Sequence, residues 1–184
     1  MNIERDHSTK QEIVITEATE AHVDRITEIY NHHILYGVGT FEEEVVDAVE
    51  MNKRRVDIQA LGLPYLVALI DGVVVGYSYL NYYRTRSAYR FTLEDSIYLD
   101  HTQTGKGLGS KLLGQLIKLA KESPKGFRQI VAVVGGSDND GSINLHKKFG
   151  FTNYYCLKSV GFKFNREVDV VFLQLSLQDS PTSA

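Results

Sequence analysis

The amino-acid sequence predicts a single α/β domain with a mixed sheet, from its length, its alternating elements and one hairpin. Its 184 residues suit one domain and are enough to bury a sizeable core. Segments with strand-like alternation are interleaved with segments of helical periodicity. The stretch YLVALI-DG-VVVGYSYL holds two β-rich runs around Asp71-Gly72, the dipeptide preferred in two-residue hairpin turns. At least two neighbouring strands are therefore expected to be antiparallel.

The first half of the chain predicts a strand and two helices besides this hairpin. Residues 12–18 (EIVITEA) alternate as a first strand. Thr19 is a suitable N-cap for a helix, because apolar residues follow it at helical spacing. Those residues are Val23, Ile26, Ile29 and Tyr30. A second helix is expected over 46–60, since Gly62 and Pro64 would end it.

The second half predicts four more strands and two helices. A strand over 89–99 is followed by a glycine-rich segment and a strongly amphipathic helix over 108–121. The remaining elements are a strand over 127–134, a short helix over 142–149 and final strands over 152–160 and 169–177. Gly150 is well placed to end the short helix.

The ends of the chain are polar and differ from the rest. Residues 1–11 predict a flexible N-terminal arm and residues 178–184 a flexible tail, so the folded domain is expected over 12–177. The N-terminal residues lack the apolar run of a signal peptide. No apolar run approaches the roughly 20 residues that a membrane span needs. The sequence thus favours a cytoplasmic protein without membrane partners.

Composition excludes several classes of function. The formal net charge is −3, with 20 basic and 23 acidic residues, which gives no basic surplus for binding nucleic acid. The single cysteine, Cys156, rules out an internal disulfide and a cysteine-based metal cluster. His32 and His33 are adjacent and cannot chelate from one helix face, so no metal site is expected.

The strand over 89–99 has one unusually polar face. Arg90, Thr92, Glu94, Ser96 and Tyr98 alternate with a more apolar set. One interpretation is a solvated strand face with a Glu–Arg pair, which is common in antiparallel sheets. The other is a carboxylate held in a partly dry cleft, where its raised pKa suits it to act as a general base. The strand ends just before the glycine-rich segment, which favours the second interpretation.

That segment, HTQTGKGLGSKLLGQLIKLAK (101–121), places Gly105, Gly107 and Gly109 at the start of a helix. Glycines weaken a helix start unless the backbone must approach something closely. Successive N–H groups and a helix N-terminus can converge on a phosphate, and Lys106 stands among the glycines. The alternative is a tight loop leading into the helix. The number of glycines favours phosphate binding.

The same segment resembles the pyrophosphate-binding motif of the GNAT N-acetyltransferase superfamily, Arg/Gln-x-x-Gly-x-Gly/Ala. It aligns as Thr104-Gly105-Lys106-Gly107-Leu108-Gly109, with threonine at the first position. Further segments occur in the order typical of phosphinothricin and methionine sulfoximine acetyltransferases, from about residue 13 to 177. They are EIYNHHI, GTFEEE, GYSYLNYYRTRSAYRFTLEDSIYL, DNDGSINLHKKFGF and VGFKFNREVD. The family's usual tryptophans are replaced by Tyr83 and Glu167.

The resemblance implies a GNAT-like domain whose central, mixed, mostly antiparallel and twisted sheet carries helices on both faces. It implies Glu94 as general base and His146 as a candidate acid or cofactor contact. The implied acetyl-CoA contacts are Ile97, Tyr98, Leu99, Thr104, Gly105, Lys106, Gly107, Leu108, Gly109, Ser110 and Asn139. The implied acceptor contacts are Arg84, Thr85, Arg86, Arg90, Asp95 and Ser96.

The implied reaction is direct transfer of an acetyl group from acetyl-CoA to the α-amine of a small amino acid or analogue. A homodimer is also implied, with Lys163 and Arg166 of the last hairpin reaching a pocket of the second subunit. Two alternatives stay open: transfer to a polyamine, aminoglycoside or protein N-terminus, and an acyl-CoA sensor without activity. The arginines near the acceptor segment argue against cationic acceptors, and Glu94 argues against a sensor.

Overall fold

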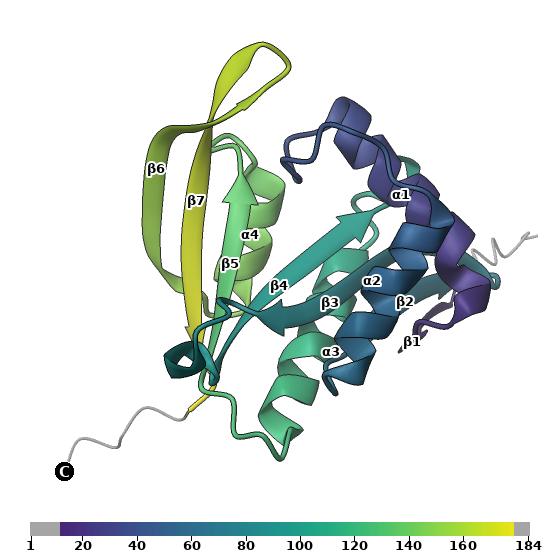
Figure 1. The fold of residues 1–184 in the computed structure, drawn as a ribbon, viewed down its shortest axis with the longest axis horizontal. Coiled ribbons are helices and arrows are strands. Elements are labelled where there is room, and N and C mark those ends of the chain that lie inside the picture. Colours follow the sequence, from purple (N-terminus) through teal and green to yellow (C-terminus); the bar gives the residue numbers. More distant parts are fainter. Residues whose placement is uncertain (1–11, 179–184) are drawn as a thin grey trace, which may run out of the picture.

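The computed structural model describes residues 12–178, so the expected arm and nearly all of the expected tail lie outside the described residues. Seven strands form one sheet in the order β1-β2-β3-β4-β5-β7-β6 (Figure 1). They are β1 (Ile13–Glu17), β2 (Tyr65–Ile70), β3 (Val73–Tyr82), β4 (Thr92–Leu99), β5 (Gln129–Gly135), β6 (Thr152–Lys163) and β7 (Arg166–Ser176). Neighbouring strands are antiparallel except β4 and β5, which are parallel. The expected mixed, mostly antiparallel sheet is confirmed.

Helices cover both faces of this sheet, as expected. They are α1 (Val23–Tyr36), α2 (Ala48–Ala60), α3 (Leu108–Glu122) and α4 (Asp140–Lys148). Figure 1 shows α1 and α2 in front of the sheet and α3 behind it. The stripe that anchors α3 is fully buried, with Leu112, Leu113 and Leu116 at 0% exposure. None of the helices within residues 12–178 is long and apolar enough to cross a bilayer.

Side-chain caps determine the first residues of α2 and α4, which the periodicity of the sequence predicts to within two residues. The Asp47 carboxylate accepts from the Glu50 N–H at 2.8 Å, so α2 begins at Ala48 and not at residue 46. The Asn139 side chain accepts from the Ser142 N–H, and α4 begins two residues before the expected start. Thr19 caps a short 3-10 turn that leads into α1 and does not cap α1 itself.

The start of β4 differs from the expected strand over 89–99. Residues Ser87–Tyr89 form a 3-10 turn, and the strand begins only at Thr92. Arg90 stabilises this turn, because its guanidinium donates to the Ser87 carbonyl at 3.2 Å. The polar strand face is therefore shorter than expected, and Arg90 does not belong to it.

The sheet opens between its two parallel strands. Thr92–Asp95 of β4 pair with Gln129–Ala132 of β5, and beyond these residues the strands separate (Figure 1). The second half of each strand therefore has one edge without a neighbouring strand. This opening is the structural basis of the site described next.

Candidate active site

A cleft of about 1030 Å³ occupies the opening between β4 and β5. Its walls are the separated halves of the two strands, the loop after α1, the glycine-rich segment and α4. It contains most of the residues expected to bind a cofactor, and both expected catalytic residues. These lining residues are Glu94, Ile97, Tyr98, Leu99, Thr104, Gly105, Gly107, Leu108, Gly109, Ser110, Asn139 and His146, and two expected acceptor contacts, Asp95 and Ser96, line the cleft with them.

The glycine-rich segment forms a cradle suited to an anion. Gly105 and Gly107 have φ of 77° and 78°, a left-handed conformation that side chains rarely adopt. Gly107 is also the N-cap of α3 and provides no side-chain cap, so the first N–H groups of this 15-residue helix stay available. Together with the helix dipole, these groups fit a pyrophosphate. Lys106 lies outside the lining, is exposed and donates to the Gln103 side chain at 2.6 Å.

Gly109 has a different role from the two glycines before it. A Cβ atom at this position would lie 3.0 Å from Cδ2 of Leu145, on α4. The missing side chain therefore lets α3 and α4 approach each other beside the cleft. Thus the three glycines found in the sequence serve two purposes, backbone conformation and close helix packing.

The free edge of β4 presents backbone groups to the cleft. The Asp100 N–H donates to Val75 of β3, whereas the Phe91 carbonyl accepts from Arg128 at the start of β5. Because these groups alternate along a strand, Ile97 and Leu99 direct their N–H groups toward the opening. Tyr98 directs its backbone toward β3, so it contributes to the lining through its side chain. The Leu99 carbonyl already accepts from Nε2 of His33 at 2.8 Å.

Glu94 occupies the environment expected of a general base. Its carboxylate is half-buried in the cleft, and it forms no ion pair within residues 12–178. Burial raises the pKa of Glu94, the nearby charge of Asp95 raises it further, and Arg84 opposes the shift. The solvated Glu94–Arg90 pair considered above is not formed. The cleft interpretation of the polar strand face is the one that the geometry supports.

Asp95 points to the other face of β4 and contacts α4. Its Oδ2 lies 2.9 Å from Nε2 of His146, and the two side chains are only 2% and 5% exposed. Nδ1 of His146 lies 2.7 Å from the Ser142 carbonyl. The two residues, 51 positions apart in the sequence, were expected in different roles, and no sequence signal joined them.

The loop after α1, residues 37–41, lies across the cleft and is fastened to the last hairpin. The ammonium of Lys163, itself 2% exposed, donates to the carbonyl oxygens of Gly37 and Thr40 at 2.8 and 2.7 Å. Burial lowers the pKa of Lys163. The expectation that Lys163 reaches into a second subunit is wrong, because its ammonium is occupied by its own chain.

Two glycines make room for the same loop. A Cβ atom on Gly135 would lie 1.9 Å from the Val38 carbonyl oxygen, and one on Gly161 would lie 2.3 Å from the Phe41 ring. The sequence predicts no role for this loop, although the family-like segment GTFEEE begins at Gly39. The Gly37-Val38-Gly39 spacing is a second local signal that points to it.

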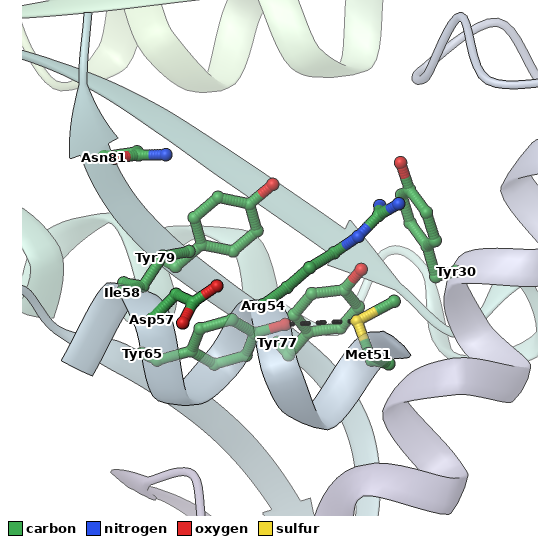
Figure 2. A pocket seen from close by; sticks show the side chains of 9 residues that line it. All are labelled: Tyr30, Met51, Arg54, Asp57, Ile58, Tyr65, Tyr77, Tyr79 and Asn81. Carbon is green, nitrogen blue, oxygen red and sulfur yellow. Dashed lines mark hydrogen bonds between the residues drawn. The ribbon is translucent and has the colours of Figure 1, made fainter. Parts of the chain in front are cut away.

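A second, smaller pocket of about 230 Å³ lies between α2 and β3 (Figure 2). Three tyrosine rings, those of Tyr65, Tyr77 and Tyr79, stack along its wall with ring centroids 5.1 to 6.4 Å apart. Asn81 stands at its edge and pairs in register with Glu94 of β4. The pocket therefore adjoins the face of the sheet that carries Glu94.

Four of the six expected acceptor contacts lie outside the main cleft. Arg84, Thr85, Arg86 and Arg90 are exposed on the loop between β3 and β4. The Arg84 guanidinium lies over the Tyr83 ring at 4.5 Å and is close enough to act on the pKa of Glu94. Asp95 and Ser96 do line the cleft, but Asp95 is committed to His146.

A helix-terminal anion cradle and a half-buried carboxylate that share one cleft fit an enzyme that transfers a group from an anionic cofactor. The chain belongs to the acetyltransferase (GNAT) family, whose model matches residues 26–151.

Individual relatives agree with this assignment. The chain is 47% identical to phosphinothricin N-acetyltransferase of Alcaligenes faecalis over 158 residues, 86% of this chain and 79% of that one. It is 39% identical to the L-methionine sulfoximine/L-methionine sulfone acetyltransferase of Salmonella typhimurium, over 88% of this chain and 93% of that one. A phosphinothricin acetyltransferase from Sinorhizobium meliloti, solved in complex with acetyl-CoA, superimposes with a TM-score of 0.86 at 40% identity, covering 94% and 92% of the two chains.

Proposed function

We propose that this protein transfers the acetyl group of acetyl-CoA to the α-amine of a small amino acid or analogue, of the phosphinothricin or methionine sulfoximine type. The observation that carries the proposal is the position of Glu94. Its half-buried carboxylate faces the same cleft as the glycine-rich cradle at the N-terminus of α3. A base and an anion site in one cleft suit transfer from a phosphate-bearing donor to an amine.

Glu94 would remove the proton that keeps the acceptor unreactive. An α-amine is largely protonated at pH 7, and only its neutral form attacks a carbonyl carbon. The raised pKa of Glu94 brings its basicity closer to that of the amine. General-base help of this kind is typically worth about 10²- to 10⁴-fold in rate.

The backbone of the cleft would hold the donor. Acetyl-CoA, when bound, supplies an acetyl group activated as a thioester. The N–H groups at residues 105–110 would bind its pyrophosphate. The free N–H groups of Ile97 and Leu99 would bind the pantetheine arm and stabilise the negative charge that develops on the carbonyl oxygen. Asn139 and Ser110 line the same cleft and complete this set.

The acceptor's carboxylate would be bound by arginine. Arg84, Arg86 and Arg90 lie outside the main cleft, on the loop between β3 and β4, and Arg84 is close enough to act on the pKa of Glu94. A guanidinium suits a carboxylate. Thr85 and Ser96 would contribute hydroxyl groups. Both ring nitrogens of His146 are occupied by hydrogen bonds, so protonation of the departing thiolate by His146 would require one of these bonds to open and is the less favoured of its two expected roles.

The proposal is tested by following CoA thiol release with a thiol-reactive dye. The panel of acceptors is L-phosphinothricin, L-methionine sulfoximine and sulfone, ordinary amino acids, spermidine and a short peptide, each with wild type and Glu94→Gln. Turnover confined to the first three, and strongly reduced in the variant, is expected. Turnover with only spermidine, or with only the peptide, would show that the acceptor is a polyamine or a protein N-terminus instead. Acetyl-CoA binding without turnover on any acceptor would favour a sensor.

We also propose that the protein is a cytoplasmic homodimer. Edge strand β6 exposes several large apolar side chains, among them Tyr155 at 72% and Phe162 at 64% exposure. Surfaces of this kind often form interfaces. Light scattering after size exclusion measures the mass, and a Tyr155→Glu variant should lower it if β6 forms the contact.

A further inference from the structure

Helix α4 forms one wall of the cleft and has a single fully buried apolar side chain, with Leu145 packed partly buried against the core. It is nine residues long, and its two buried side chains are Ile143 and His146. One of these two anchors is thus a polar ring, which must be satisfied by hydrogen bonds to be stable in that position. Its partners are Asp95 of β4 and the Ser142 carbonyl.

The hydrogen-bond geometry fixes the number of protons on this pair. A carbonyl oxygen only accepts, so Nδ1 of His146 must carry a proton for Ser142. A carboxylate also only accepts, so Nε2 must carry one for Asp95. A neutral imidazole has one N–H and cannot serve both. The arrangement that leaves Asp95 ionised is therefore an imidazolium–carboxylate pair.

Among residues 12–178, Asp95 is the one charged group in contact with the His146 ring. The ring of Phe151, the residue before β6, packs edge-on at 5.0 Å, and the Ser142 hydroxyl lies 3.5 Å from Nδ1. Burial lowers the pKa of His146, but the bonds to Asp95 and to the Ser142 carbonyl outweigh it, so the pKa is raised. The same bonds occupy both ring nitrogens, and neither is free for a ligand.

We propose that Asp95 and His146 form a buried ion pair that fastens α4 to β4, and that its role is to position the cofactor-binding wall and not to move a proton. Asp95 is then a positioning residue, in place of the acceptor contact expected from the resemblance. The inference builds on the proposed function only in naming acetyl-CoA as the ligand of this wall. A pair that loses a proton has one N–H for two acceptors, so the fastening weakens at alkaline pH.

The first measurement is made on the free protein. ¹⁵N NMR of the His146 imidazole should show both ring nitrogens protonated at pH 7 in wild type, and one of them deprotonated in Asp95→Asn. A neutral His146 in wild type would overturn the proposal. This readout needs no acceptor and no turnover, so it stands even if the proposed acceptor class is wrong.

The second measurement is the Kd of acetyl-CoA by calorimetry between pH 6 and 9. In wild type, Kd should rise as His146 loses its proton. In Asp95→Asn/His146→Gln, a neutral amide pair can keep a hydrogen bond, so Kd should stay within about tenfold of wild type and lose this pH dependence. Ile143→Ala is the matched control, because it weakens the packing of the same helix without changing a charged group. It should raise Kd by the same factor at every pH.

The turnover number separates positioning from proton transfer. If the pair only positions the wall, the double variant should keep kcat at saturating acetyl-CoA close to that of wild type. A kcat reduced by about 10² or more in the double variant, with Kd unchanged, is the result expected of a general acid and would overturn the proposal.

Discussion

The ammonium nitrogen of Lys163 lies 2.7 Å from the carbonyl oxygen of Thr40, which joins residues 123 positions apart. This bond links the tip of the β6–β7 hairpin to the loop after α1, and that loop lines the cleft. Substituting Lys163→Met keeps the length of the side chain but leaves the Gly37 and Thr40 carbonyls without a donor. We expect a loss of about 1 to 3 kcal/mol in the free energy of unfolding and a higher KM.

Chemical denaturation and steady-state kinetics check this expectation. Lys53→Met is a suitable control, because Lys53 forms an exposed i,i+4 pair with Asp57 on α2 and should change little. Equal stabilities of the two variants would show that the Lys163 bonds do not hold the loop.

The pH dependence of kcat/KM should report the ionisation of Glu94. A base acts only when ionised, and the pKa of Glu94 is raised by burial and by Asp95. Activity should therefore disappear, as pH falls, at a pH above the ordinary glutamate range. The variant Arg84→Gln removes the charge that opposes this shift, so its acidic limb should move to higher pH. A limb that moves down or stays fixed in this variant would contradict the placement of Arg84 near Glu94.

Gly107 should contribute to cofactor binding through its backbone conformation. Its φ is 78° and a Cβ atom would meet nothing within 4 Å, so Gly107→Ala introduces strain without a clash. We expect about 1 to 2 kcal/mol of lost stability and a several-fold higher Kd for acetyl-CoA.

Gly72 provides the matched control for this substitution. It has the same φ of 78° and equally open surroundings, but it lies in the β2–β3 turn away from the cleft. Gly72→Ala should lose similar stability and keep the wild-type Kd. If Gly107→Ala also keeps that Kd, the cradle does not bind the cofactor.

Gly161 and Phe41 should behave as a coupled pair. A Cβ atom at Gly161 would overlap the Phe41 ring, so Gly161→Ala should destabilise the protein by about 1 to 3 kcal/mol. Phe41→Leu shortens the side chain and should make the glycine substitution better tolerated. A double-mutant cycle measures this coupling, and additive effects would mean that the ring moves aside freely.

The fold was predictable from local signals, and the differences between the predicted and observed element bounds have local causes. Asp71-Gly72 and the alternation on either side placed β2 and β3 within two residues of their bounds. The first residues of α2 and α4 depended on which polar side chain turned back to cap the helix, which periodicity does not reveal. The start of β4 was placed three residues too early because Tyr89 and Phe91 continue the alternation of the strand.

The site was predictable only where its residues lie in one segment. The glycine cradle and Glu94 each follow from a contiguous pattern, and both line the cleft. The pair of Asp95 with His146 and the bonds of Lys163 to the loop after α1 depend on contacts between distant segments. Such contacts are set by the packing of the whole chain, and nothing in either segment alone specifies the partner.

The short pairing of β4 with β5 makes the molecule two half-sheets joined along four residues of each strand. Acetyl-CoA bound in this opening would lie between the two half-sheets, in the place of an added strand. Its contacts with both would make the half-sheets unfold together. Ligand at one hundred times its Kd adds about 2.7 kcal/mol to the stability of the folded state. The protein's resistance to heat or proteolysis should therefore follow the supply of its donor, so that its lifetime would depend on the substrate it consumes.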